Sequence, residues 1–246
     1  MYEEFSLTYD LLTQDVDYPN RSNYILSLFE KFDRTPTLLL DLACGTGGFS
    51  NCFAKKGISV IGVDISPDML NVAQNNSKEK NLDVLYLCQD ATELDLYGTV
   101  DGAVCCQDSL NHILSFEDLC KALSRVSLFL EKDRLFIFDL NTPYKHQEIL
   151  GNNTFVLEEE NLFCVWQNQY TKESNTVDIA LDFFKETEEG LYERSSEIIS
   201  ERAYTEKEIA LALERASLKI EGIFEELTLN SPQKETQRIF YVTRKV

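Results

Sequence analysis

The chain has 246 residues, 43% of them hydrophobic and 11% aromatic, which is enough to bury the core of one α/β domain or of one domain with a small appendage. Its 42 acidic and 23 basic residues give a formal net charge of −19, which argues against nucleic acid and anionic membrane surfaces as partners. The seven cysteines lack metal-ligand spacing, no signal peptide starts at Met1 and no apolar run reaches ~18 residues, so we expect a cytoplasmic protein with reduced thiols and no metal site.

The N-terminal region is predicted to be helical. Apolar residues at helical spacing between positions 25 and 32 predict a helix, with Asn20 or Ser22 as its N-cap. Arg21 is interpreted as a surface arginine, although it could pair with a ligand carboxylate.

Strands that alternate with helices follow Pro36. The leucine-rich run 37–42 lacks polar alternation, as expected for a parallel strand covered on both faces. Ser66 and Pro67 read as the N-cap and first residue of a helix after the second strand. The spacing predicts a parallel sheet with right-handed crossovers, whose further strands cover residues 58–63, 83–88, 100–106 and 135–140.

The pattern changes after Pro143. Residues 155–204 contain no convincing helix, and their β-rich runs predict an antiparallel insert lying on the parallel sheet. His146, at the start of this region, is placed in a loop without a visible partner. A capping box at Thr205 then opens a last helix, and residues 219–229 and 237–244 predict two closing strands.

Glycines and carboxylates follow the first three strands. Gly45 and Gly47 lie where the first strand must turn into a helix. Asp64 ends the second strand, where its carboxylate could accept hydrogen bonds from both hydroxyls of a ribose, and Asp90 ends the third, where it could accept from a base amino group. Each acid alone could be a solvated carboxylate or a helix cap; together with the glycine turn they indicate a nucleotide-type cofactor pocket.

Two kinds of cofactor compete for this pocket. A dinucleotide needs its pyrophosphate at the helix N-terminus and usually a third glycine, but Ser50 occupies that position. Asp41, just ahead of the turn, would repel a pyrophosphate and suits a cofactor with a positive amino group.

The stretch Asp41–Gly47, Asp-Leu-Ala-Cys-Gly-Thr-Gly, resembles the first motif of class I S-adenosylmethionine-dependent methyltransferases. The segments 63–70, 89–91, 101–104 and 107–112 are similar to its later motifs, and the resemblance covers about residues 37–140 and the closing elements. It implies an α/β fold with a doubly wound, seven-stranded, mostly parallel sheet whose last strand is antiparallel. The implied cofactor is S-adenosyl-L-methionine and the product S-adenosyl-L-homocysteine.

The resemblance also implies a set of cofactor-binding residues. Asp41 and the glycine turn would hold the methionine end, Asp64 the ribose, and Gln107 would approach the sulfonium. Ile65, Met69 and the pair Asp90–Ala91 would surround the adenine. The full set is Tyr9, Tyr18, Asp41, Ala43, Gly45, Gly47, Asp64, Ile65, Met69, Asp90, Ala91 and Gln107.

The segment Tyr9-Asp10-Leu11-Leu12 and Tyr18 resemble a subset of small-molecule methyltransferases in which this segment is a lid and the tyrosines can face the cofactor. We therefore expect four parts. They are an N-terminal helical lid (1–36), a Rossmann-like cofactor core (37–145), an antiparallel β insert over the acceptor pocket (146–204), and the closing helix and strand pair of the core (205–246).

The methyl acceptor is the least determined part of the interpretation. A sulfonium methyl is already activated, so alignment of a nucleophile in line with the S–CH₃ bond can suffice for a neutral amine, whereas an oxygen acceptor would want a base. His112 and Asn111, after the fourth strand, are the catalytic candidates, although packing roles compete. The sequence predicts an enzyme acting on a small molecule, as a monomer or homodimer. A dinucleotide-dependent oxidoreductase and a non-catalytic cofactor-binding module remain as alternatives.

Overall fold

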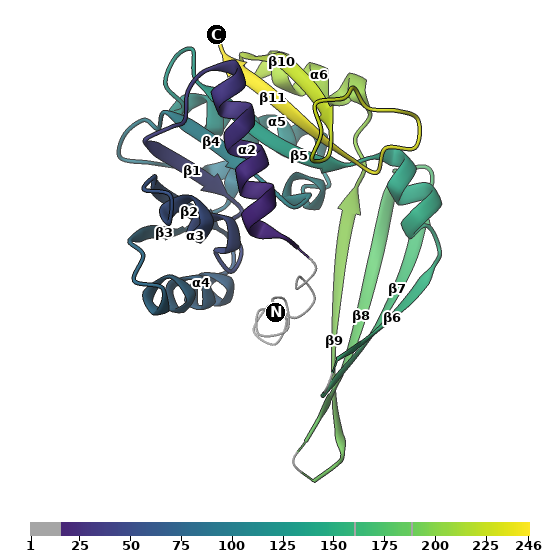
Figure 1. The fold of residues 1–246 in the computed structure, drawn as a ribbon. Coiled ribbons are helices and arrows are strands. Elements are labelled where there is room, and N and C mark those ends of the chain that lie inside the picture. Colours follow the sequence, from purple (N-terminus) through teal and green to yellow (C-terminus); the bar gives the residue numbers. More distant parts are fainter. Residues whose placement is uncertain (1–15, 160, 188) are drawn as a thin grey trace.

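A computed structural model of the chain describes residues 16–159, 161–187 and 189–246. The predicted alternation of strands and helices is confirmed, and Figure 1 shows one large sheet with helices against it and a second sheet projecting from it. The core elements are α2 (Tyr18–Phe32), β1 (Leu38–Leu42), α3 (Gly48–Ala54), β2 (Ser59–Asp64), α4 (Pro67–Glu79), β3 (Val84–Cys88), η1 (Ala91–Glu93), β4 (Gly102–Cys105), η2 (Ser109–His112), α5 (Phe116–Phe129), β5 (Leu135–Asn141), α6 (Glu206–Arg215), β10 (Leu218–Glu225) and β11 (Arg238–Lys245).

The large sheet has seven strands in the order β10-β11-β5-β4-β1-β2-β3. Strands β1 to β5 pair in parallel, and β11 pairs antiparallel with both β5 and β10, so the expected sheet with its antiparallel last strand is confirmed. The strand order reverses between β1 and β4. In open α/β sheets a ligand binds at such a switch point, outside the carboxyl ends of the strands.

Both faces of this sheet are covered by apolar helix faces, which explains why its strands lack polar alternation. One buried cluster packs α2 and α3 against the sheet through Phe29 and Phe53. The other packs α5 and α6 against the opposite face through Leu123 and Ile209. The two layers hold the carboxyl ends of β1, β2 and β4 rigidly at one edge.

The insert is a separate four-stranded antiparallel sheet in the order β6-β7-β8-β9 (Figure 1). Its elements are η3 (Lys145–Leu150), β6 (Thr154–Glu159), β7 (Leu162–Thr171), β8 (Thr176–Glu186) and β9 (Tyr192–Arg202). The predicted antiparallel character is confirmed. The loop predicted around His146 is wrong, because residues 145–150 form a π-helical turn.

The start of α2 also differs from the prediction. Asp17, rather than Asn20 or Ser22, is the N-cap: its carboxylate accepts a hydrogen bond from the Asn20 amide at 3.0 Å, and Pro19 lies in the first turn. By contrast, the predicted cap at Ser66 and the capping box of Thr205 and Glu208 are confirmed. No helix among the described residues is long and apolar enough to cross a membrane.

Candidate functional site

The chain leaves β1 through a tightly wound turn. Ala43, Gly45 and Gly47 have φ values of 55°, 54° and 80°, in the left-handed region that disfavours side chains. Gly47 is the N-cap of α3, and the first amides of a helix have no partner within the helix itself. The Gly45 amide donates to Asp64 Oδ2 at 2.8 Å, which ties the turn to the end of β2.

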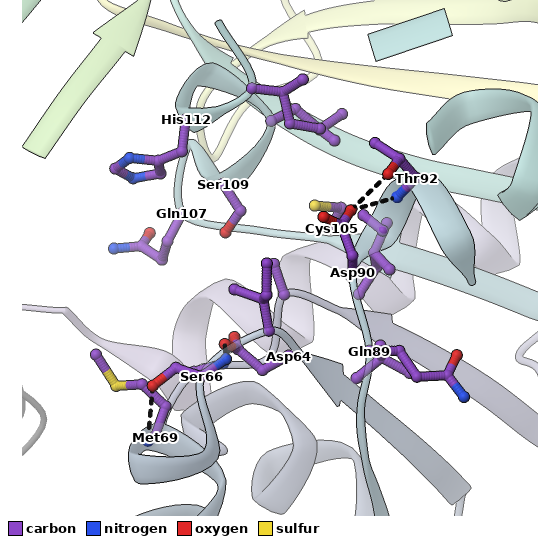
Figure 2. A pocket seen from close by; sticks show the side chains of 18 of the residues that line it. Asp64, Ser66, Met69, Gln89, Asp90, Thr92, Cys105, Gln107, Ser109 and His112 are labelled. Atoms are coloured by element: carbon purple, nitrogen blue, oxygen red, sulfur yellow. Dashed lines mark hydrogen bonds between the residues drawn. The ribbon is translucent and has the colours of Figure 1, made fainter. Parts of the chain in front are cut away.

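A cavity of about 560 Å³ opens above these strand ends. It is lined from β1, β2, the residues after β3 and β4, and from Ile199 of β9 in the insert. In Figure 2, Asp64 lies at the centre, with Met69 and Ser66 below it and Gln107, Ser109 and His112 above it. Of the predicted cofactor residues, those that line it are Ala43, Gly45, Asp64, Ile65, Met69, Asp90, Ala91 and Gln107.

The Asp64 carboxylate is fixed by the backbone. Its Oδ2 accepts from Gly45 and its Oδ1 accepts from the Ser66 amide at 2.9 Å. Burial raises the pKa of Asp64, and the amides of Ser66 and Gly45 act in the opposite direction. Because a carboxylate oxygen can accept two hydrogen bonds, each oxygen retains acceptor capacity for a ligand in the cavity.

The far end of the cavity has apolar walls with a polar rim. Ile65 is 61% exposed although it is aliphatic, whereas Met69 is buried beside it. Asp90 caps η1: its Oδ1 accepts from the Thr92 amide at 2.7 Å and from the Thr92 hydroxyl at 2.8 Å (Figure 2). An exposed aliphatic surface beside polar acceptors suits a flat, hydrogen-bonding ring.

A smaller hollow of about 20 Å³ adjoins the large cavity at the turn. Its lining includes Tyr18, Asp41 and Gln107, and it shares Gly45 with the large cavity. Tyr18 packs on the turn itself, since a Cβ at Gly48 would lie 2.5 Å from its ring. Asp41 is 1% exposed, and burial, opposed by the Ser50 hydroxyl, raises its pKa to about 7.

The residues after β4 also adopt unusual backbone conformations. Gln107 and Asp108 have φ values of 59° and 52°, which costs free energy for residues with side chains. Gln107 Oε1 is buried and has no hydrogen-bond partner in the described part of the chain. Strain and an unpaired buried oxygen at a switch point are typical of a position adapted to a ligand.

A buried ionic cluster lies behind this turn. Arg238 at the start of β11 donates to Asp139 at 2.5 Å and lies 3.2 Å from Asp108 and 3.3 Å from Glu226. Burial alone would raise the pKa of Asp108, but Arg238, Lys145 and His112 together more than offset it, and the net pKa is below the ordinary range. Arg21 of α2, interpreted from the sequence as a surface arginine, is partly exposed and also pairs with Glu226.

The candidate residues after β4 have different surroundings. His112 lines the large cavity. Asn111 is fully buried: its amide nitrogen donates to the carbonyls of Asn141 and Arg202 at 3.3 and 2.8 Å, and its oxygen accepts from the Asn141 amide at 2.9 Å. Asn111 therefore joins β5 to β9 and does not line the cavity.

Sequence reasoning missed the partner of His146. This histidine is fully buried, and its Nε2 lies 3.0 Å from Glu201 of β9. Of the remaining predictions, Gly47 shapes the turn without lining the cavity, and Tyr9 lies outside the described residues.

Comparisons with known proteins match this architecture. A family profile described as a methyltransferase domain matches residues 39–133. Relatives with methyltransferase names in Geobacillus sp. (strain WCH70) and Bacillus subtilis (strain 168) are each 28% identical, over 99% and 100% of this chain and 99% and 97% of theirs. A S-adenosylmethionine-bound amino pentose methyltransferase from Micromonospora echinaspora, 18% identical with a TM-score of 0.78, covers 99% of this chain and 98% of its own, and shares the fold.

The crystal structure of a S-adenosylmethionine-dependent methyltransferase from Clostridium acetobutylicum has a TM-score of 0.89 and 34% identity, over 99% of this chain and 98% of that chain. A match of this identity over nearly the full length favours the methyltransferase interpretation over the dinucleotide-dependent oxidoreductase. The chain belongs to the class I S-adenosylmethionine-dependent methyltransferases, with S-adenosyl-L-methionine as its cofactor.

Proposed function

We propose that the chain transfers the methyl group of S-adenosyl-L-methionine to a small-molecule acceptor, through in-line attack by an amine or oxygen nucleophile. The observation that carries this proposal is a cavity of about 560 Å³ that brings Asp64, Asp90, Gln107 and His112 together at the switch point of the sheet. In-line alignment in a site closed to water can supply about 7–11 kcal/mol in favourable cases.

The adenosine half of the cofactor is assigned to the large cavity. The Asp64 oxygens, already oriented by two backbone amides, would accept hydrogen bonds from the ribose hydroxyls. Ile65 and Met69 would lie against the adenine ring, and Asp90 and Ala91 would contact its polar edge. Because the bonds of Asp90 described above go to Oδ1, its Oδ2 is the oxygen assigned to the adenine amino group.

The methionine half is assigned to the end of the large cavity that adjoins the smaller hollow. Asp41 would face its ammonium group. Because Ala43, Gly45 and Gly47 have small side chains or none, the methionine part of the cofactor could approach the backbone of the turn closely. Gln107 lines both spaces, and its unpartnered Oε1 would meet the positive sulfonium. Tyr18 would close this end, together with Tyr9 of the N-terminal segment. Here residues 1–36 would act as the lid.

The acceptor is assigned to the side of the cavity where His112 and Ile199 meet. His112 would contact the acceptor and could take a proton from an oxygen nucleophile. Asn111 would act as a positioning residue, because its bonds hold β5 and β9 together beneath that wall. In this arrangement the insert covers the acceptor and residues 37–145 and 205–246 form the cofactor body. All seven cysteines are free thiols, which supports a reducing, cytoplasmic setting.

Calorimetric titration with S-adenosyl-L-methionine, S-adenosyl-L-homocysteine and NAD tests the cofactor site. We expect binding of the first two and not of NAD. Asp64→Ala should weaken binding about 100-fold or more, because two charge-assisted hydrogen bonds are worth ~1.5–3 kcal/mol each. Asp83→Ala, at an exposed aspartate ahead of β3, is the matched control and should leave affinity unchanged. Equal affinities for the two variants would contradict the assignment.

Transfer itself is tested with a labelled methyl group and a pool of small metabolites. We expect label in an amine or hydroxyl compound, and a lower transfer rate for His112→Gln with unchanged affinity for S-adenosyl-L-homocysteine. If the protein binds the cofactor and no metabolite becomes labelled, the chain is a non-catalytic cofactor-binding module.

A further inference from the structure

A line of hydroxyl groups lies beneath the glycine turn. The Ser50 hydroxyl lies 2.5 Å from Asp41 Oδ2, and it is near enough to the Tyr86 hydroxyl to act against the burial that raises the pKa of Tyr86. The Tyr86 hydroxyl lies 2.9 Å from Ser77 Oγ, which lies 2.7 Å from Asn51 Oδ1. The Asp41 carboxyl is thus joined through three hydroxyls to a side-chain amide.

Tyr86 lies directly against the turn that holds the cofactor. A Cβ placed on Gly47 would lie 2.4 Å from the Tyr86 hydroxyl oxygen, and one on Gly62 would lie 2.7 Å from its ring. The hydroxyl line therefore supports the turn from below, while the cofactor would occupy the space above it.

The hydroxyl groups of this line can donate their hydrogen bonds either away from Asp41 or toward it. When Asp41 is protonated, each hydroxyl donates away from it, and Ser77 donates to Asn51 Oδ1 or to the Ala73 carbonyl, both of which lie within hydrogen-bond distance. When Asp41 is ionised, each hydroxyl donates toward it, and Ser77 then needs a donor. Asn51 Nδ2, which is buried and has no hydrogen-bond partner among the described residues, can become that donor when the amide rotates. The two states therefore differ in which Asn51 atom is paired: Oδ1 in the first and Nδ2 in the second.

The line also reaches solvent without passing through the cofactor site. Tyr86 and Ser77 line a surface hollow of about 310 Å³ between α4 and β3, and this hollow shares no lining residue with the large cavity. Water in this hollow could take a proton from Ser77 even when the cofactor fills the large cavity.

The Ser50 hydroxyl and amide are the groups that favour the charge of Asp41, and its titratable neighbours do not. The titratable groups that face it are Asp64 of β2, Cys44 of the turn, Cys105 and Cys106 at the end of β4, and Tyr86 of β3, and none of these carries a positive charge. Burial raises the pKa of Asp41 to about 7, so a proton shared with the line can leave near neutral pH.

We propose that Asp41 carries a proton in the cofactor-free protein and releases it when the cofactor's ammonium group binds, and that the line Ser50–Tyr86–Ser77–Asn51 passes this proton on by reversing its hydrogen bonds. In this transfer one proton leaves the Asp41 carboxyl and one proton passes from Ser77 to water. Each hydroxyl between them gives one proton and receives one. Tyr86 is then a positioning residue for cofactor binding. This inference rests on the proposed assignment of the methionine end to Asp41.

Proton release is measured by titrating the full chain with S-adenosyl-L-homocysteine in phosphate and in imidazole buffers between pH 6 and 8. We expect release of about half a proton at pH 7, and a Kd about tenfold larger at pH 6 than at pH 8, because the ligand binds the ionised form. Binding enthalpies that agree in the two buffers at pH 6 and pH 7 would overturn the inference. Absence of binding at every pH would instead overturn the proposed function.

Single substitutions test which side chains take part in the proton release. Asp41→Asn should remove the buffer dependence at any affinity that can be measured. Tyr86→Phe should move the midpoint of proton release to higher pH, because the ionised carboxylate loses the donor behind Ser50. Ser77→Ala, a smaller change, should move it in the same direction. Tyr241→Phe, at a buried tyrosine stacked on Phe138, is the matched control and should leave the midpoint in place. Unchanged midpoints in both line variants would exclude the line.

Discussion

Two physical constraints favour glycine at position 47: the backbone conformation and the space beside the Cα atom. The matched variants Gly47→Ala and Gly57→Ala separate these two constraints. Its φ of +80° disfavours any side chain, and an added Cβ would lie 2.4 Å from the Tyr86 hydroxyl and 3.1 Å from Ala73 Cβ. Gly57, in the turn that follows α3, has a φ of +83°, and no atom of the described residues lies within 4 Å of an added Cβ. Gly57→Ala therefore carries the backbone cost alone, ~1–2 kcal/mol.

Gly47→Ala carries the same backbone cost and an overlap with a packed side chain, which typically adds ~1–3 kcal/mol. We expect a loss of unfolding free energy of about 2–5 kcal/mol for Gly47→Ala against about 1–2 kcal/mol for Gly57→Ala. At ~2–4 °C per kcal/mol for a chain of this size, the two melting temperatures should differ by several degrees.

Urea unfolding at pH 7 measures both variants, and the double variant Gly47→Ala with Tyr86→Phe provides an internal check. Loss of the hydroxyl removes the 2.4 Å overlap but leaves the ring carbon at 3.3 Å, so part of the stability should return. If Gly47→Ala costs no more than Gly57→Ala, Tyr86 does not constrain the turn, and the close approach described above is wrong.

Two further predictions concern the buried polar groups. Arg238→Met leaves Asp139, Asp108 and Glu226 without their shared cation and should cost about 3–5 kcal/mol in urea unfolding, against less than about 1 kcal/mol for Arg215→Met at an exposed pair with Glu117. Since Arg238 depresses the folded pKa of Asp108 despite burial, the wild type should lose stability as the pH falls below ~4, and the variant should lose less; equal acid sensitivity would contradict this. Asn111→Ala should cost about 2–4 kcal/mol for its three buried bonds, with S-adenosyl-L-homocysteine affinity within about threefold, while Asn23→Ala at an exposed site should change little. An unchanged unfolding midpoint would remove the positioning role of Asn111.

The cofactor half of the molecule could be predicted because its signals are local. The strand before Asp41, the glycines of the turn and the acid that ends β2 follow one another within about one βαβ unit, and the order of elements alone places them at one edge of the sheet. The cap at Ser66 is equally local, since a serine, a proline and an acid mark a helix start within three residues.

The buried ionic cluster could not be predicted in this way. Arg238 and Asp139 are 99 positions apart, and Arg238 and Asp108 are 130 apart, so no spacing in the sequence connects them. Arg238 reads as an ordinary polar residue at the start of a strand. His146 and Glu201 meet only because the insert returns to the core, and a single sequence carries no signal for that contact. One signal could have indicated this cluster. Several acidic residues lie at the ends of predicted strands, and acids that become buried there need a cation as partner.

The hydrogen bonds of the Asn111 side chain have a consequence for how this fold can diversify. One amide side chain bonds the carbonyl of Asn141, where the chain leaves β5, and that of Arg202, where β9 ends. The two points where the insert leaves the core and returns to it therefore lie within hydrogen-bond distance of one side chain. A segment with neighbouring ends can be lengthened, shortened or exchanged without moving the elements on either side of it. Descendants of such a chain could acquire new covering sheets by recombination at these two points, and inherit the cofactor body intact.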